Sequence, residues 1–124
     1  MKEKHLLITG RPASGKTEIL IAFANMFPKT TLFLSEECTE DLLKNKKGLN
    51  ELVKVVNSSE FTYEETQNYT SLCVDYLELL SDETLQKIIK TIKQSNLQVI
   101  VTSQVKRRQN EVLDRIESLI SRRH

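Results

Sequence analysis

The fold of this chain is decided by residues 5–26, which read HLLITGRPASGKTEILIAFANM. The apolar run at residues 5–9 is typical of a buried strand, and residues 16–26 have the spacing of a helix. Between the two lies a loop that fits the pattern G-x-x-x-x-G-K-[ST], namely Gly10-Arg11-Pro12-Ala13-Ser14-Gly15-Lys16-Thr17. A strand, this loop and a helix in that order are the setting that a phosphate-binding loop requires. The segment therefore predicts a site for a nucleoside triphosphate.

The loop residues have separate physical roles. Gly10 and Gly15 permit backbone conformations that turn successive N–H groups inward, and the positive end of the following helix adds to them. We expect Lys16 to reach the terminal phosphates and the hydroxyl of Thr17 to bind Mg²⁺. Residues 11–14 mainly shape the span between the glycines. The expected ligands are ATP and Mg²⁺.

The rest of the chain repeats the alternation of strand and helix. Apolar runs of strand length recur at residues 31–35, 52–56, 70–76 and 97–102, and helical spacing recurs at residues 39–47 and 82–94. Such alternation predicts an α/β fold, with a mostly parallel sheet of about five strands and helices on both faces. A length of 124 residues predicts one domain that spans residues 1–124.

Two further features lie in the segment before the fourth strand and in the last residues of the chain. Residues 58–68 are polar and predict a loop with about one helical turn. Beyond residue 110, an apolar helical stripe is formed by Val112, Leu113, Ile116, Leu119 and Ile120. We expect this stripe to pack on the chain's own sheet rather than on a partner.

Bulk composition excludes several classes of protein. The formal net charge of +1 creates no general attraction for nucleic acid or for a membrane. No apolar run reaches the length of about 18 residues that a membrane helix needs, and the first residues do not resemble a signal peptide, so we expect a cytoplasmic protein without a membrane partner. Cys38 and Cys73 show neither zinc-site nor disulfide spacing, and each is expected to be a small buried residue.

Polar residues that end apolar strands are candidates for the chemistry. Asp75 follows the run 71–74, where a carboxylate could hold Mg²⁺ through the water shell of the ion. Glu36 and Glu37 follow residues 31–35, and either one could be the general base that orients water, or both are solvated and flank the next helix. Because the carboxyl ends of parallel strands share one edge of the sheet, these side chains are expected to converge on the phosphate loop.

Two more residues at this edge have open roles. Gln104 ends the run 99–103, and its amide could hydrogen-bond the terminal phosphate or the attacking water, or it is an ordinary loop residue. Glu78, three residues beyond Asp75, is either a helper at the site or an exposed loop residue.

Four segments, in this order along the chain, resemble the ATPase domain of the hexameric DnaB-type replicative helicases, a branch of the RecA-like ATPases. They read GRPASGKT at residues 10–17, LSEEC at 34–38, DYLELL at 75–80 and SQVKR at 103–107. The resemblance covers roughly residues 4–110. Glu78 departs from it, because the family usually has glutamine at that position.

The resemblance assigns roles to these residues. It makes residues 10–17 the Walker A motif and Asp75 the Walker B carboxylate, and it aligns Glu37 with the catalytic glutamate, with Glu36 one register away. Gln104 matches the glutamine that senses the phosphate. It also implies a RecA-like sheet in which the strand ending at Gln104 lies between the strands that lead to Lys16 and to Asp75.

The function that the resemblance implies is a Mg²⁺-dependent ATPase, a hydrolase, that acts in DNA replication or another DNA transaction within a larger assembly. A helicase or another protein is the expected partner, because only 20 residues follow Gln104, where the family continues with further strands and an arginine finger. Arg107 and Arg108 could contact single-stranded DNA, or they form a solvated basic turn. The arginines of the final helix could act on a neighbour's nucleotide, or they form a charged helix face; they are Arg115, Arg122 and Arg123.

Two other functions stay open at this point. A nucleotide-binding regulatory or interaction module that hydrolyses ATP slowly or not at all would use the same loop. A small-molecule kinase would use it too, although no acceptor-binding or lid segment is evident in the sequence.

Overall fold

A computed structural model describes residues 5–10, 15–36, 39–104 and 111–121. Its centre is one sheet of five strands in the order β1-β5-β4-β2-β3. All neighbouring strands are parallel. The strands are β1 (Leu6–Gly10), β2 (Thr31–Ser35), β3 (Lys54–Asn57), β4 (Ser71–Asp75) and β5 (Gln98–Gln104).

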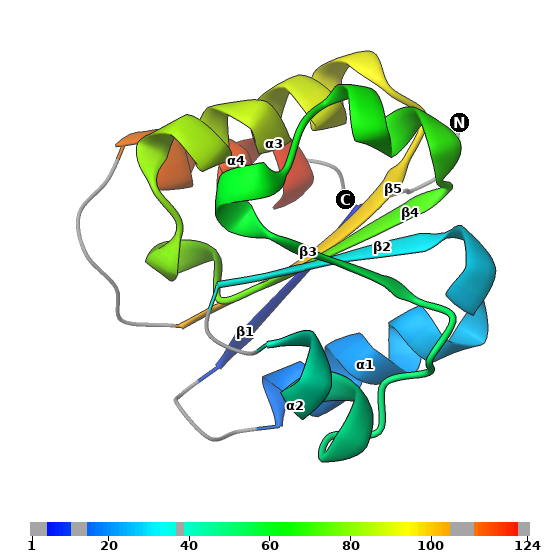
Figure 1. The fold of residues 1–124 in the computed structure, drawn as a ribbon. Coiled ribbons are helices and arrows are strands. Elements are labelled where there is room, and N and C mark those ends of the chain that lie inside the picture. Colours follow the sequence, from blue (N-terminus) through cyan, green and yellow to red (C-terminus); the bar gives the residue numbers. More distant parts are fainter. Residues whose placement is uncertain (1–4, 11–14, 37–38, 105–110, 122–124) are drawn as a thin grey trace.

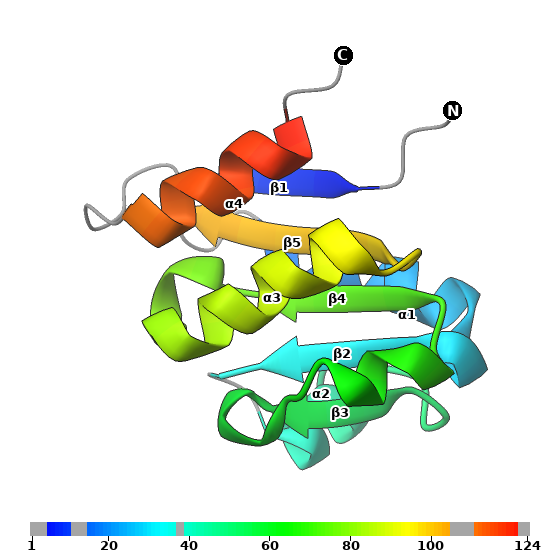
Figure 2. The same cartoon turned by 90° about the horizontal axis from the view of Figure 1, so that it is seen from above.

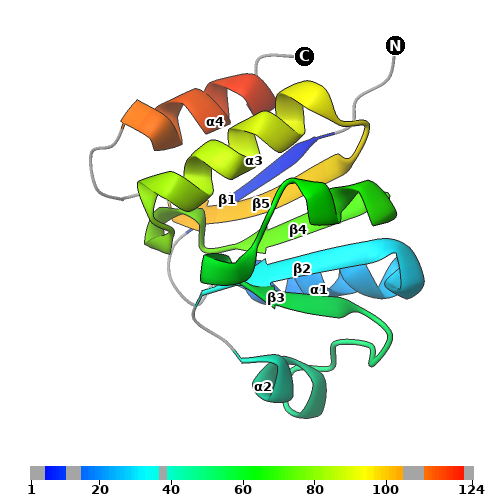
Figure 3. The ribbon, with the colours of Figure 1, turned by 45° about the horizontal axis from the view of Figure 1, so that its top comes forward.

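Helices cover both faces of the sheet, as Figures 1 and 3 show. On one face lie α3 (Asp82–Gln94) and α4 (Glu111–Ser121), and on the other lie α1 (Lys16–Met26) and α2 (Glu40–Asn45). Short 3₁₀ turns complete the chain, namely η1 (Pro28–Thr30), η2 (Ser58–Glu60), η3 (Glu64–Asn68) and η4 (Leu77–Leu79). The predicted α/β fold with a parallel, doubly covered sheet is confirmed.

Successive residues of each strand belong to opposite faces. Leu34 and Val74 are buried in the apolar cluster with α3 and α4. Phe33 and Cys73 are buried in the cluster with α1. This alternation follows from the period of two in a β-strand, and because both faces are covered, the strands are apolar at nearly every position. The stripe of α4 packs on its own sheet as predicted, with Leu113, Ile116 and Ile120 in the α3 and α4 cluster.

Three predicted elements have the bounds that the structure shows. They are the strand at residues 31–35 and the helices at residues 16–26 and 82–94. Thr39 caps α2 by accepting from the amide of Leu42, and Ser81 caps α3 by accepting from the amide of Thr84.

Other predicted bounds are displaced. The third strand begins at Lys54 rather than at residue 52, because Leu52 lies in a turn in which Val53 donates to the carbonyl of Asn50. The fifth strand extends to Gln104, because its last residues pair with β1 as far as Gly10. The polar segment 58–68 contains two 3₁₀ turns rather than one helical turn.

The strand order brings distant parts of the chain together. β5 lies between β1 and β4, as the resemblance implies. Gly10 is opposite Gln104 in the register, and Ser35 is opposite Asp75. The carboxyl ends of all five parallel strands therefore share one edge. None of the helices in the described ranges has the length and apolar character needed to cross a membrane.

Candidate functional site

The predicted phosphate loop leads into α1 through a glycine. Gly15 has a φ of 87° and is the N-cap of the helix, and its carbonyl accepts from the amide of Ile19 at 3.1 Å. Glycine adopts this left-handed conformation without the penalty that a Cβ atom imposes. Lys16 and Thr17 thus open the helix and are both buried. Residues 11–14 lie outside the described part of the chain.

A buried carboxylate meets the start of α1. The hydroxyl of Thr17 donates to Oδ2 of Asp75 at 3.0 Å, and the hydroxyl of Thr102 donates to Oδ1 at 2.8 Å. Asp75 is the last residue of β4 and is fully buried. An unpartnered buried carboxylate would cost several kcal/mol, so the two hydroxyl donors stabilise this position. The structure therefore brings into contact the two residues that the sequence predicted as metal ligands.

Thr102 is a site residue that the sequence analysis missed. Its hydroxyl also accepts from the amide of Tyr76 at 2.7 Å, so it holds both Asp75 and the backbone that follows. The alternation of side chains between the two faces of a strand could have identified Thr102. Ile100 faces α1, and a residue two positions further along the same strand faces the same side.

The backbone turns sharply directly after Asp75. Tyr76 has a φ of 56°, the left-handed region that a residue with a side chain adopts at a cost of about 1–2 kcal/mol. The turn leads into η4, where Glu78 is buried. The interpretation of Glu78 as an exposed loop residue is therefore wrong. Residues in such conformations cluster at functional sites.

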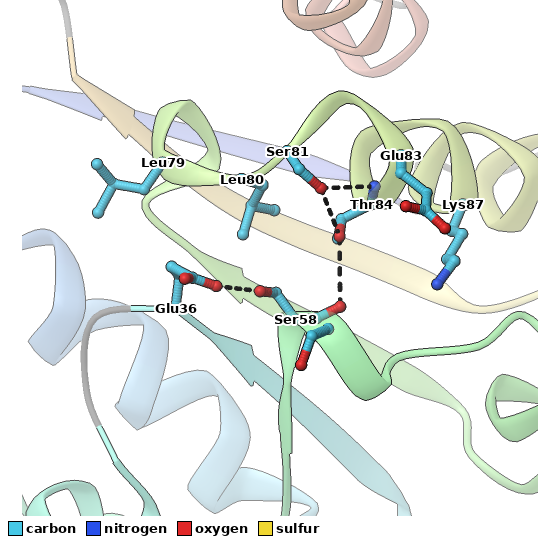
Figure 4. Close-up of a pocket in the computed structure, with 9 residues that line it drawn as sticks. Glu36, Ser58, Leu79, Leu80, Ser81, Glu83, Thr84 and Lys87 are labelled. Atoms are coloured by element: carbon cyan, nitrogen blue, oxygen red, sulfur yellow. Dashed lines mark hydrogen bonds between the residues drawn. The ribbon is translucent and has the colours of Figure 1, made fainter.

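Glu36 lies on the other side of the sheet from Thr17 and Asp75. Leu34 faces α3, and Glu36, two positions later, accepts a hydrogen bond from the hydroxyl of Ser58 at the start of η2. Figure 4 shows these two side chains directed at each other. The carboxylate of Glu36 is therefore directed toward Ser58 and not toward the start of α1. Glu37, the other candidate base, lies outside the described residues.

The pocket in Figure 4 is separate from the buried carboxylate. Its volume is about 380 Å³, and it lies between η2, η4 and the start of α3. The polar groups around it bond one another, since the hydroxyl of Thr84 donates to the carbonyl of Ser58 at 3.3 Å and Ser58 donates to Glu36. This pocket is on the α3 side of the sheet, whereas Thr17 lies on the α1 side.

The remaining candidates are placed only in part. Gln104 ends β5 opposite Gly10, but its side chain is outside the description. Arg107, Arg108, Arg122 and Arg123 lie outside the described residues. Arg115 is exposed on α4.

Cys73 is the small buried residue that the sequence predicted. It is buried in β4, and burial together with the negative charge of Asp75 raises the pKa of its thiol from 9.0 to about 12. The thiol is therefore protonated at neutral pH. Cys38 lies outside the described residues.

The oxygen atoms of Thr17 and Asp75 are suited to binding Mg²⁺. The hydroxyl of Thr17 has a single proton, which it donates to Asp75, so its lone pairs are left to bind a cation. Hydroxyl and carboxylate oxygens are ligands that Mg²⁺ accepts, with water and phosphate oxygens completing its octahedron. Among the described residues no group of three or more His, Cys, Asp or Glu could hold a metal ion. A metal here would thus need ligands from a bound phosphate or from water.

Comparison of the sequence with models of protein families and with curated proteins finds no match to either. The chemistry of the site is therefore inferred from its own residues and geometry.

Proposed function

We propose that this chain binds ATP with Mg²⁺ at the carboxyl edge of β1, β5 and β4 and hydrolyses it, as a RecA-like P-loop ATPase of the DnaB helicase type. The observation that carries the proposal is the hydrogen bond between Thr17 and Asp75, which lie 58 positions apart. A helix-opening Lys-Thr pair and a buried strand-end carboxylate were selected from the sequence by separate criteria. Their contact is what a nucleotide and its metal ion require.

The residues present fit the ligands. Backbone N–H groups of residues 10–15 and the N-terminus of α1 would surround the phosphates, and Lys16 would bind the terminal ones. Thr17 would bind Mg²⁺ directly, and Asp75 would hold its water shell. When bound, the ion neutralises charge on the phosphate oxygens.

Hydrolysis also needs a group that orients water, and we assign this role to Glu37. Support comes from its neighbour, because the carboxylate of Glu36 bonds to Ser58 on the other side of the sheet. Gln104, at the end of the strand next to β1, is proposed to sense the terminal phosphate. The position of β5 between β1 and β4 supports the assignment to the RecA-like class.

The biological setting is also part of the proposal. We assign the chain to DNA replication or another DNA transaction in the cytoplasm, as one component of a larger assembly. A cation from a helicase or another partner would complete the site, since transferring a phosphoryl group develops charge that needs stabilising. The isolated chain should then hydrolyse ATP slowly.

Titration calorimetry with ATP tests the proposal, with and without Mg²⁺, on the wild type and on Lys16→Ala. We expect Mg²⁺-dependent binding by the wild type and a loss of most of it in the variant. Lys44→Ala is the matched control, because Lys44 lies on α2 and pairs with Glu40 at 2.8 Å. Phosphate release with and without single-stranded DNA then separates an ATPase from a binding module. Wild-type protein that binds no ATP at millimolar concentration would refute the proposal.

A further inference from the structure

The pocket in Figure 4 takes no part in the proposed ATP site, and its own lining indicates a second ligand. It lies between η2, η4 and the first turn of α3, which Figure 2 shows gathered at the carboxyl ends of β3 and β4 on the α3 side of the sheet. Its volume of about 380 Å³ falls within the range of roughly 300–1,000 Å³ that small-molecule sites occupy. Every residue that lines the pocket belongs to the described part of the chain.

The hydroxyl groups at the centre of the pocket offer lone pairs rather than protons. A carboxylate and a carbonyl can only accept, so a hydroxyl that bonds to one of them must be the donor. Ser58 therefore donates to Oε1 of Glu36, and Thr84 donates to the carbonyl of Ser58 at 3.3 Å. Because the proton of Thr84 is used in this way, Ser81 must donate to Oγ1 of Thr84 at 3.1 Å. Each hydroxyl has one proton, so these three groups can only accept from a ligand.

The charged side chains of the pocket are two carboxylates and one ammonium, from Glu36, Glu83 and Lys87. The ammonium of Lys87 donates to the carbonyl of Phe61 at 2.9 Å. Oε1 of Glu36 accepts from Ser58, whereas Oε2 accepts from none of the described residues. The pocket therefore has an excess of negative charge and a carboxylate oxygen that is open to a donor.

An apolar wall lies beside this carboxylate. Figure 4 shows Glu36 and Leu79 on one side of the central hydroxyls. Glu83 and Lys87 lie on the other side. Leu79 is 47% exposed, and the fully buried Leu80 also lines the pocket. A ligand whose polar group reaches Glu36 thus has apolar side chains next to the rest of its atoms.

We propose that this pocket binds an alkyl guanidinium group, such as the side chain of arginine carries. The planar group pairs with the carboxylate of Glu36, and its five N–H donors match the lone pairs of the central hydroxyls. The alkyl chain packs against Leu79 and Leu80. The positive charge of the ligand offsets the excess negative charge of the lining.

Other ligands fit this lining less well. An anion would meet two carboxylates and no available proton on the central hydroxyls. For a metal ion, the described residues contain no group of three or more His, Cys, Asp or Glu that could hold it. An ammonium is a compact and strongly hydrated charge, whereas a guanidinium is planar and more weakly hydrated. The guanidinium therefore suits acceptors that are spread over η2 and α3 beside an apolar wall.

Two-dimensional ¹H–¹⁵N NMR of the wild type without nucleotide tests the proposal. The probe is N-acetyl-arginine methylamide, titrated to about 50 mM because a single side chain binds with millimolar affinity. We expect saturable shifts for the amides of residues 58–59 and 79–84, and unchanged amides for residues 40–45 in α2. N-acetyl-citrulline methylamide has the same shape without the charge and should bind at least about tenfold more weakly. N-acetyl-lysine methylamide should also bind more weakly.

A further titration with free arginine identifies the source of the guanidinium group. Tighter binding of free arginine than of the blocked probe would identify a small molecule, because its α-carboxylate is attracted by Lys87. Binding of the blocked probe that is equal or tighter would identify an arginine residue of a partner protein. Either result supports a guanidinium site.

Two variants locate the binding group. Glu36→Gln removes the charge but keeps an oxygen that can accept from Ser58, and it should weaken binding of the blocked arginine at least about fivefold. Glu60→Gln is the matched control, because Glu60 is exposed in the same η2 turn but does not line the pocket. It should leave the binding unchanged.

Three outcomes would overturn the proposal. They are a wild type without saturable shifts at these residues, equal binding of the citrulline probe, and equal losses in Glu36→Gln and Glu60→Gln. The shifts are measured on the unmodified protein, so the main readout does not depend on how a variant folds. Because no nucleotide is present, none of these results bears on the proposed ATP site.

Discussion

Thr102 and Asp75 are fully buried side chains on adjacent strands, and the threonine hydroxyl donates to the carboxylate at 2.8 Å. The same hydroxyl accepts from the amide of Tyr76. One threonine thus fixes both the proposed metal-binding carboxylate and the strained turn that follows it.

Replacement of this threonine should be costly. Thr102→Val removes a donor from a buried carboxylate and an acceptor from a backbone amide, so we expect a loss of about 1–3 kcal/mol in the free energy of unfolding. Urea unfolding measures the loss. Thr91→Val is the control, because Thr91 is equally buried but its hydroxyl donates to the carbonyl of Lys87 within α3. Equal effects of the two substitutions would contradict the role assigned to Thr102.

The carboxylate of Asp75 should be responsible for the Mg²⁺ dependence of ATP binding. Asp75→Asn removes the charge without adding bulk, so we expect a folded protein whose affinity for ATP responds much less to Mg²⁺. Calorimetry in the presence and absence of Mg²⁺ measures the difference. Asp41→Asn, at an exposed position of α2, should keep the full response. An unchanged Mg²⁺ response in Asp75→Asn would rule this carboxylate out as the metal site.

The two adjacent glutamates should behave differently in hydrolysis. Glu37→Gln should keep ATP binding and lose turnover, since a group that orients water contributes to the transition state rather than to ground-state affinity. Glu36→Gln should keep both, because its carboxylate bonds to Ser58 on the α3 side of the sheet. Single-turnover phosphate release, with calorimetry as the check on binding, distinguishes them. The reverse pattern would make Glu36 the base.

The thiol of Cys73 should be unreactive in the folded protein. Its pKa is raised to about 12, so little thiolate is present at pH 8, and burial excludes reagents as well. Iodoacetamide labelling followed by peptide mass spectrometry should therefore modify Cys73 only after denaturant is added. Rapid labelling of Cys73 in native protein would contradict its buried position.

The same thiol should make stability depend on alkaline pH. In the unfolded chain the thiol loses its proton from about pH 9, whereas in the folded chain it keeps the proton up to about pH 12. The unfolded state then binds fewer protons, and stability decreases as pH rises through this window. Urea unfolding at about pH 8 and about pH 10 should show a smaller decrease for Cys73→Ala than for the wild type.

Local sequence was sufficient to predict the helices and strands and some residues of the candidate site. The bounds of α1 and α3 and the caps at Thr39 and Ser81 follow from periodicity and capping within a few neighbouring residues. Asp75 could be selected as a candidate because a carboxylate that ends an apolar strand is costly to bury without partners. These features depend on interactions between residues that are close together along the chain.

The contacts between side chains of different elements depend on the tertiary structure. Thr102 meets Asp75 because β5 lies next to β4, and Glu36 turns to Ser58 because β3 lies next to β2. The exposure of Leu6 follows from the position of β1 at an edge of the sheet. Pairing between distant strands depends on how all the apolar faces are buried together, and no local pattern of residues encodes that arrangement.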